Sequence, residues 1–192
     1  MRQDLGCMQF DENCEGCKIS QKKKVLQGGI ITLDGGWILN HYGDDQAFLG
    51  WMVLQPFEHK MEFQCLADPE VRALGPNIKR IDSFLREYWE CKFPDDAIQR
   101  LYVAHFFEGP FDSPPPKAKY HLHIHLITRP ASFDRLLRED VGKKPNGKKT
   151  GLNAWKIYRI LRDHPVDFPK EYRKTRKNVE ALMNYLRGKL GS

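Results

Sequence analysis

Three histidines alternate with apolar residues in the run His121-Leu122-His123-Ile124-His125. Side chains alternate faces along a β-strand, so we expect the three imidazoles to share one face at spacings of about 6.6 Å. Imidazole has an ordinary pKa of about 6.5, and its neutral form can act as a nucleophile, a general base or a metal ligand. Burying three polar rings in a core without hydrogen-bond partners would cost folding free energy. We therefore favour a catalytic site over a site that only binds metal, and both over a purely structural row.

A Cys-x-x-Cys pair, Cys14 and Cys17, is the second feature that could carry chemistry. The chain has five cysteines, an odd number, and its first residues show no signal-peptide pattern, which argues against a disulfide framework. In a reducing compartment this spacing is typical of metal or redox chemistry, and it matches a zinc ligand pair. Two further ligands would have to come from elsewhere in the chain. The alternative is a pair of unligated surface cysteines.

Size and composition limit the class of protein. A length of 192 residues favours one domain with elaborations over two full domains. Hydrophobic residues make up 41% and charged residues 29% of the chain, which is typical of a soluble domain built around one core. The sequence contains no apolar stretch of about 18 residues, which argues against a membrane span. We expect a cytoplasmic protein with no membrane partner.

The net charge of +6 is concentrated in three basic clusters, at residues 22–24, 143–149 and 170–177. Such clusters suit an anionic ligand such as a nucleotide or a nucleic acid. They are equally compatible with a solvated basic surface. Charge alone therefore leaves the partner open.

The elements that would position these residues begin with strands. Short apolar runs bounded by turn residues are typical of strands, and Asp34-Gly35-Gly36 predicts a hairpin turn between the first two. The strands expected are 30–33, 37–39, 50–55, 101–107 and 120–127.

Helical patterns separate and follow the strands. Asp68-Pro69 is typical of an N-cap followed by a first-turn proline, yet Gly75-Pro76 should break or kink that first turn. Apolar residues at three- and four-residue steps therefore predict a helix only from about Asn77 to Cys91. Later helices are expected at 133–138, 153–162 and 169–189. The last should pack one apolar face, with Tyr172, Val179, Leu182 and Leu186, on the core. We expect residues 131–192 to be a helical basic extension packed on the same domain as residues 1–130.

The run His-Leu-His-Ile-His-Leu-Ile resembles the signature of the histidine-triad superfamily, in which three histidines alternate with apolar residues and two more apolar residues follow. The resemblance extends upstream through 37–40 and 50–56 to His59, and it covers about residues 14 to 130. It implies an α+β fold with an antiparallel sheet of about five strands and a long helix packed on it. It also implies a homodimer.

The resemblance implies a mechanism on a nucleotide or dinucleotide substrate. The middle histidine, here His123, attacks the α-phosphorus and forms a covalent nucleotidyl-histidine, which water or another acceptor then resolves. His125 would bind the phosphate and help to protonate the leaving group, and Asn40 matches a position that contacts the ribose. Covalent catalysis of this kind splits one difficult displacement into two easier steps.

The resemblance also implies a complete metal site. Some relatives, and the related galactose-1-phosphate uridylyltransferases, join an N-terminal Cys-x-x-Cys to a histidine after the third strand and to the first histidine of the triad. The matching residues are His59 and His121, which with Cys14 and Cys17 would hold zinc. Four protein ligands leave no open position, so this zinc would be structural.

The segment before the triad departs from the family pattern. Many relatives carry Gln or Ser there on the phosphate, whereas this chain has Lys117-Ala118-Lys119-Tyr120. Lys119 can bind a polyphosphate as a point charge or remain solvated surface, and Ser113 is a candidate for the missing hydroxyl. His105 either faces the pocket or is structural.

Two classes of function therefore stay open. The first is a nucleotide hydrolase or nucleotidyl transferase, acting on dinucleoside polyphosphates, nucleoside phosphoramidates or nucleotide sugars. The alternative is a nucleotide- or nucleic-acid-binding module with weak or no catalysis. Repair of adenylylated nucleic-acid ends, as in aprataxin-like relatives, is less favoured, because the tail shows no nucleic-acid motif.

Overall fold

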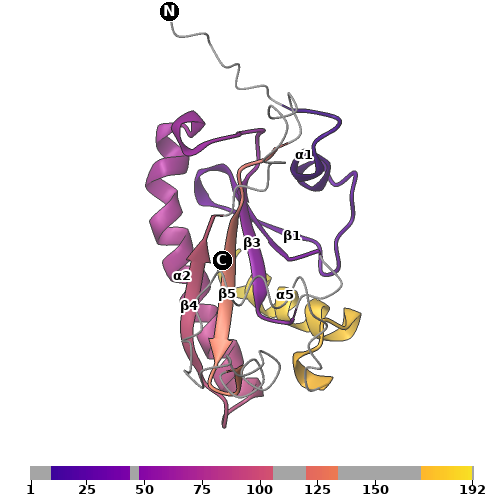
Figure 1. Cartoon of the computed structure of the whole chain (residues 1–192), viewed down its shortest axis with the longest axis vertical. Helices are drawn as coiled ribbons and strands as arrows, with labels where there is room; N and C mark the ends of the chain where they lie inside the picture. The colour runs from indigo at the N-terminus through magenta and orange to yellow at the C-terminus, as the bar shows by residue number, and fades with distance from the viewer. Residues whose placement is uncertain (1–9, 44–47, 106–119, 134–169, 192) are drawn as a thin grey trace, which may run out of the picture.

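The chain folds around a five-stranded antiparallel sheet with the strand order β1-β2-β3-β5-β4 (Figure 1). The computed structural model describes residues 10–43, 48–105, 120–133 and 170–191. The sheet and its helices confirm the expected α+β class. The strands are β1 (Ile30–Leu33), β2 (Trp37–His41), β3 (Trp51–Pro56), β4 (Ile98–Ala104) and β5 (Ile124–Pro130).

Two helices cover one face of this sheet. The long helix α2 (Asp68–Lys92) contacts β2 and β4, and α5 (Arg176–Leu190) packs against α2, β1 and β2. The short helix α1 (Glu15–Ser20) is bound to Gln55, whose neighbour Leu54 is buried in the core and so points to the opposite side of β3. No helix in the described ranges is both long enough and apolar enough to cross a membrane.

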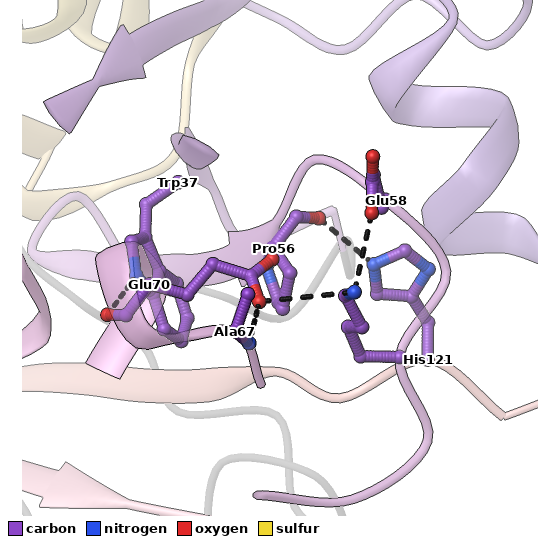
Figure 2. A network of polar contacts seen from close by, with 7 residues as sticks. Trp37, Pro56, Glu58, Ala67, Glu70 and His121 are labelled. Carbon is purple, nitrogen blue, oxygen red and sulfur yellow. Dashed lines mark hydrogen bonds and ion pairs between the residues drawn. The ribbon is translucent and has the colours of Figure 1, made fainter. Parts of the chain in front are cut away.

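Helix α2 begins at Asp68, so the prediction of a start near Asn77 was wrong. Its first turn is anchored, because Glu70 accepts a hydrogen bond from the backbone N–H of Ala67 at 2.6 Å. The carbonyl of Glu70 in turn accepts the indole N–H of the buried Trp37 at 2.8 Å (Figure 2). These contacts hold the first turns in place and offset the helical hydrogen bond that Pro76 removes. The predicted end holds, since Phe93 caps the helix.

The two strands nearest the histidines begin elsewhere than expected. β4 starts at Ile98, before the predicted Leu101, and β5 starts at Ile124, after the predicted Tyr120. Residues 121–123 therefore approach the sheet without belonging to it. The backbone N–H of Leu122 pairs instead with the carbonyl of Lys60 at 2.7 Å. This connection ties the histidine run to the segment that follows β3.

The last helix is shorter than the predicted 169–189. Thr175 caps it by accepting a hydrogen bond from the backbone N–H of Asn178 at 3.2 Å. Tyr172 is buried, but it belongs to a separate 3-10 turn at Lys170–Tyr172. Val179, Leu182 and Leu186 are buried on one helical face, which confirms the core-facing stripe. The helix expected at 153–162 and nearly all of that at 133–138 lie outside the described residues.

Candidate functional site

The triad histidines lie at the start of β5 and just before it. The alternating residues Leu122, Ile124 and Leu126 are buried, as the pattern predicts. The rings of His123 and His125 lie side by side, with centroids 4.9 Å apart. The ring of His121 faces a separate group of cysteine and histidine side chains. The row therefore divides into a pair and a single ring with different neighbours.

Hydrogen bonds assign a tautomer to each ring of the pair. Nδ1 of His123 lies 2.8 Å from the carbonyl oxygen of His121, so Nδ1–H donates and Nε2 keeps its lone pair. The indole N–H of Trp51 donates to Nδ1 of His125 at 2.9 Å. Nε2 of His125 therefore carries that ring's proton. The pair offers one lone pair and one N–H donor on neighbouring rings.

His125 stays uncharged at neutral pH. Its burial, and then the neighbouring His123 and His105, lower the pKa of His125 to about 3. A neutral ring with a proton on Nε2 can donate a hydrogen bond to an anion without being a cation. This is consistent with a role in holding a phosphate oxygen, as the resemblance implies.

Trp51 is a site residue that the sequence did not single out. It is 1% exposed, and its indole stacks on Tyr42 with ring centroids 4.5 Å apart. The β3–β5 register pairs Val53 with His125, which brings the strand of Trp51 alongside the histidine. Knowing that β3 pairs with β5 would have pointed to Trp51, but the sequence alone does not tell which strand lies next to β5.

A cleft of about 520 Å³ opens beside His123. Asn40 is 2% exposed at its wall; its Nδ2 donates to the carbonyl of His41 at 2.9 Å, and its Oδ1 has no hydrogen-bond partner among the described residues. The structure thus brings Asn40 together with His121 and His123, whereas Ser113 and Lys119 lie outside the described residues. The lining also includes Glu15, Gly16, Ile19, Lys24, Leu26, Tyr42, Gly43, Val53, Gln55 and Tyr120.

The basic residues that the structure describes contribute little to this cleft. Lys24 lines it, and its ammonium forms an ion pair with Glu15 at 2.6 Å. Lys174, from the third cluster, donates instead to the carbonyl of Gly43 at 2.7 Å. The cluster at 143–149 lies outside the described residues. Within the described ranges, the cleft therefore has a mainly neutral lining.

The four residues expected to bind metal lie together. One donor atom from each of Cys14, Cys17, His59 and His121 falls within 4.8 Å of the others, and all four residues are buried. Sγ of Cys17 lies 3.2 Å from Nδ1 of His59, and Sγ of Cys14 lies 3.5 Å from Nδ1 of His121. The structure thus unites residues from the N-terminal arm, the loop after β3 and the triad.

The chemistry of these four donors fits a cation with tetrahedral coordination. Nε2 of His121 donates to the carbonyl of Pro56 at 2.9 Å (Figure 2). The lone pair on Nδ1 is therefore directed at the sulfurs of Cys14 and Cys17. The backbone N–H of Asp11 also donates to Sγ of Cys17 at 3.4 Å. Burial raises the pKa of Cys14 to about 12, so its thiol needs a bound cation to lose its proton. Two sulfurs and two imidazoles are a donor set typical of zinc.

A buried lysine fastens the loop that carries His59. The ammonium of Lys60 lies 3.1 Å from the carboxylate of Glu58 and 3.8 Å from that of Glu70, in the first turn of α2 (Figure 2). The carbonyl of Lys60 accepts the N–H of Leu122. One residue thus connects the long helix, the metal-binding loop and the histidine run.

Helix α1 packs its backbone directly on the ring of His121. A Cβ atom on Gly16 would lie 2.4 Å from Cγ of His121, closer than any side chain can approach. The carbonyl of Gly16 also accepts a hydrogen bond from Nε2 of Gln55 at 3.0 Å. The absence of a side chain at this position therefore sets the distance between the helix and the histidine.

We predict that Gly16→Ala moves His121 and weakens metal binding. Overpacking a buried site costs about 1–3 kcal/mol, and the free energy of unfolding should fall by that amount, with a lower bound metal content. The matched control is Gly188→Ala in α5, where an added Cβ meets no atom within 4 Å. That change should stabilise the protein by about 0.5–1 kcal/mol. Equal unfolding midpoints for the two variants would contradict the packing argument.

Comparisons with known proteins indicate the fold of the chain. No family model matches the chain, and no curated protein sequence matches it. A Hit-like protein involved in cell-cycle regulation from Bartonella henselae has a similar structure, with a TM-score of 0.52 and 12% sequence identity. The alignment covers 94% of this chain and 99% of that one. At this identity the similarity shows the fold alone: the chain shares the α+β fold of a Hit-like protein.

Proposed function

We propose that the protein is a nucleotide-phosphate hydrolase or nucleotidyl transferase that acts through a nucleotidyl-histidine intermediate on His123. The observation that carries this proposal is the arrangement of the paired rings. Nε2 of His123 holds a lone pair, and the adjacent Nε2 of His125 holds a proton. A nucleophile beside an uncharged donor suits attack on a phosphate ester.

The first chemical step can be written from these atoms. The lone pair on Nε2 of His123 attacks the α-phosphorus, and a nitrogen–phosphorus bond forms. The bond from phosphorus to the leaving group breaks, and the leaving group takes its electron pair. The carbonyl of His121 stabilises the charge that develops on the attacking ring, because it accepts a hydrogen bond from Nδ1–H. Nε2–H of His125 donates to a phosphate oxygen. In the second step, water or another acceptor attacks the phosphorus. The nitrogen–phosphorus bond breaks, its electron pair returns to Nε2 of His123, and the proton of the acceptor passes to solvent.

The cleft beside His123 suits the nucleoside. Its volume of about 520 Å³ lies within the range of about 300–1,000 Å³ that is usual for small-molecule sites. Tyr42 and Val53 give it apolar wall area, and the buried Oδ1 of Asn40 can accept a hydrogen bond from a ribose hydroxyl. A sugar hydroxyl at this point would satisfy an acceptor that is otherwise buried without one.

Cys14, Cys17, His59 and His121 would hold a structural zinc ion. With four protein ligands it would cross-link the N-terminal arm to the histidine run and take no part in the reaction. These residues act on catalysis indirectly. They fix His121, and the carbonyl of His121 orients the ring of His123.

The test is turnover by the purified protein of a dinucleoside polyphosphate, a nucleoside phosphoramidate and a nucleotide sugar. We expect at least one class to reach a kcat/KM of about 10⁴ M⁻¹s⁻¹ or more, the low end for enzymes on their own substrates. Nucleotide binding without turnover of any class would favour the alternative, a nucleotide- or nucleic-acid-binding module. Binding to nucleic acid would then weaken steeply with salt.

A further inference from the structure

A row of rings leads from His123 to the protein surface. The ring of Tyr120 lies 5.9 Å from that of His123, and its hydroxyl lies 2.8 Å from Nε2 of His105. The ring of His105 in turn meets that of Phe63 edge-on, with centroids 5.2 Å apart. Desolvation and then the nearby His123 lower the pKa of His105, which agrees with a position close to the catalytic pair. We call Phe63, His105 and Tyr120 the aromatic row.

The aromatic row extends beyond the cleft. Tyr120 lines the cleft, whereas Phe63 and His105 do not. Phe63 is 44% exposed on a 3-10 turn (Phe63–Cys65), and His105 is exposed directly after β4. Tyr120 therefore lies between the cleft and a second surface, which is formed by the exposed rings of Phe63 and His105.

We propose that the aromatic row is a leaving-group subsite that stacks the second nucleobase of a dinucleoside polyphosphate. The inference rests on the proposed function and selects one of its substrate classes. With one nucleoside in the cleft and its α-phosphorus at His123, the remaining phosphates and the second nucleoside can extend past Tyr120. There an exposed phenyl ring offers a nucleobase a face on which to stack.

The chemistry of the row distinguishes this leaving group from the other candidates. A nucleobase has a π-face that stacks on aromatic rings, whereas the leaving groups of alkyl phosphoramidates and nucleotide sugars have none. The bond between Tyr120 and His105 holds two of the rings in place before any ligand binds. The row takes no part in bond making, because the leaving group departs with its electron pair on a phosphate oxygen.

The test compares two substrates that share one nucleoside: a dinucleoside polyphosphate, and a nucleoside phosphoramidate of a small alkyl amine. Phe63→Ala should lower kcat/KM for the dinucleotide by roughly 5- to 150-fold, the range for one stacked base, mainly through KM. It should change kcat/KM for the phosphoramidate by less than about twofold. Phe63→Trp should retain the dinucleotide activity. The matched control is Phe57→Ala, which removes another partly exposed ring, one that packs on Phe10 instead.

Each other outcome overturns the inference. Equal losses on both substrates, or none on the dinucleotide, would show that Phe63 does not contact the leaving group, while the proposed function would stand. Failure of the wild-type protein to turn over the dinucleotide would overturn this subsite, and the proposed function would fall only if the phosphoramidate and a nucleotide sugar were not turned over either.

Discussion

Replacing His123 by alanine should abolish turnover of every nucleotide substrate and leave the fold intact. The variant loses the only lone pair that the paired rings present, so no covalent intermediate can form. Removal of a catalytic nucleophile costs on the order of 10⁴-fold or more in kcat. The ring is only half-buried and makes one backbone hydrogen bond, so the free energy of unfolding should change by about 1 kcal/mol or less.

The measurement is the mass of the intact protein after rapid quenching with substrate. Wild-type protein should gain the mass of one nucleotidyl group, and His123→Ala should gain none. His123→Gly leaves a cavity where free imidazole can act, so added imidazole should restore part of the turnover. His125→Ala serves as the comparison, because it should slow labelling without preventing it. A nucleotidyl adduct on His123→Ala would show that another residue is the nucleophile.

The alternation of histidines with apolar residues predicted the central part of the site. Burial of Leu122, Ile124 and Leu126 follows from the alternation of apolar residues, which a single sequence is enough to show. The approach of Cys14 and Cys17 to His121 does not follow from periodicity, since more than a hundred residues separate them. Only the resemblance to a known family joined these segments in advance.

Tertiary contacts explain what the sequence could not predict. The early start of α2 depends on the bond from Trp37 to Glu70, and local helix propensity at Gly75-Pro76 gives no hint of it. The tautomer of His125 depends on Trp51, which lies on another strand. The aromatic row is invisible for the same reason, because Phe63, His105 and Tyr120 come from three separate segments.

Purified protein should contain about one equivalent of zinc, and loss of that metal should release the N-terminal arm. Helix α1 has only six residues, too few for a helix that is stable by itself. Gln55 joins this helix to the sheet through hydrogen bonds to Gly16 and Ser20. Cys17 joins the helix to the cluster of four ligands. Without a cation, the cluster would be four buried polar groups with poorly satisfied donors and acceptors. The arm should then detach and leave His121 without its packing partner.

Cys17→Ser tests this dependence, with Cys91→Ser as the matched control. Cys17 is 1% exposed in the cluster, whereas Cys91 is exposed near the end of α2. Structural zinc supplies about 10–16 kcal/mol in small zinc-finger peptides. Here the sheet keeps its own core, so we expect a smaller loss, about 3 kcal/mol, which corresponds to a fall in Tm of roughly 6–12 °C. Turnover should also fall, because a displaced His121 no longer orients the ring of His123. Cys91→Ser should keep its zinc, its Tm and its turnover. Metal-free protein with full turnover and an unchanged Tm would show that neither the stability nor the activity of the protein depends on zinc. The paired rings of His123 and His125 would then account for the activity without it.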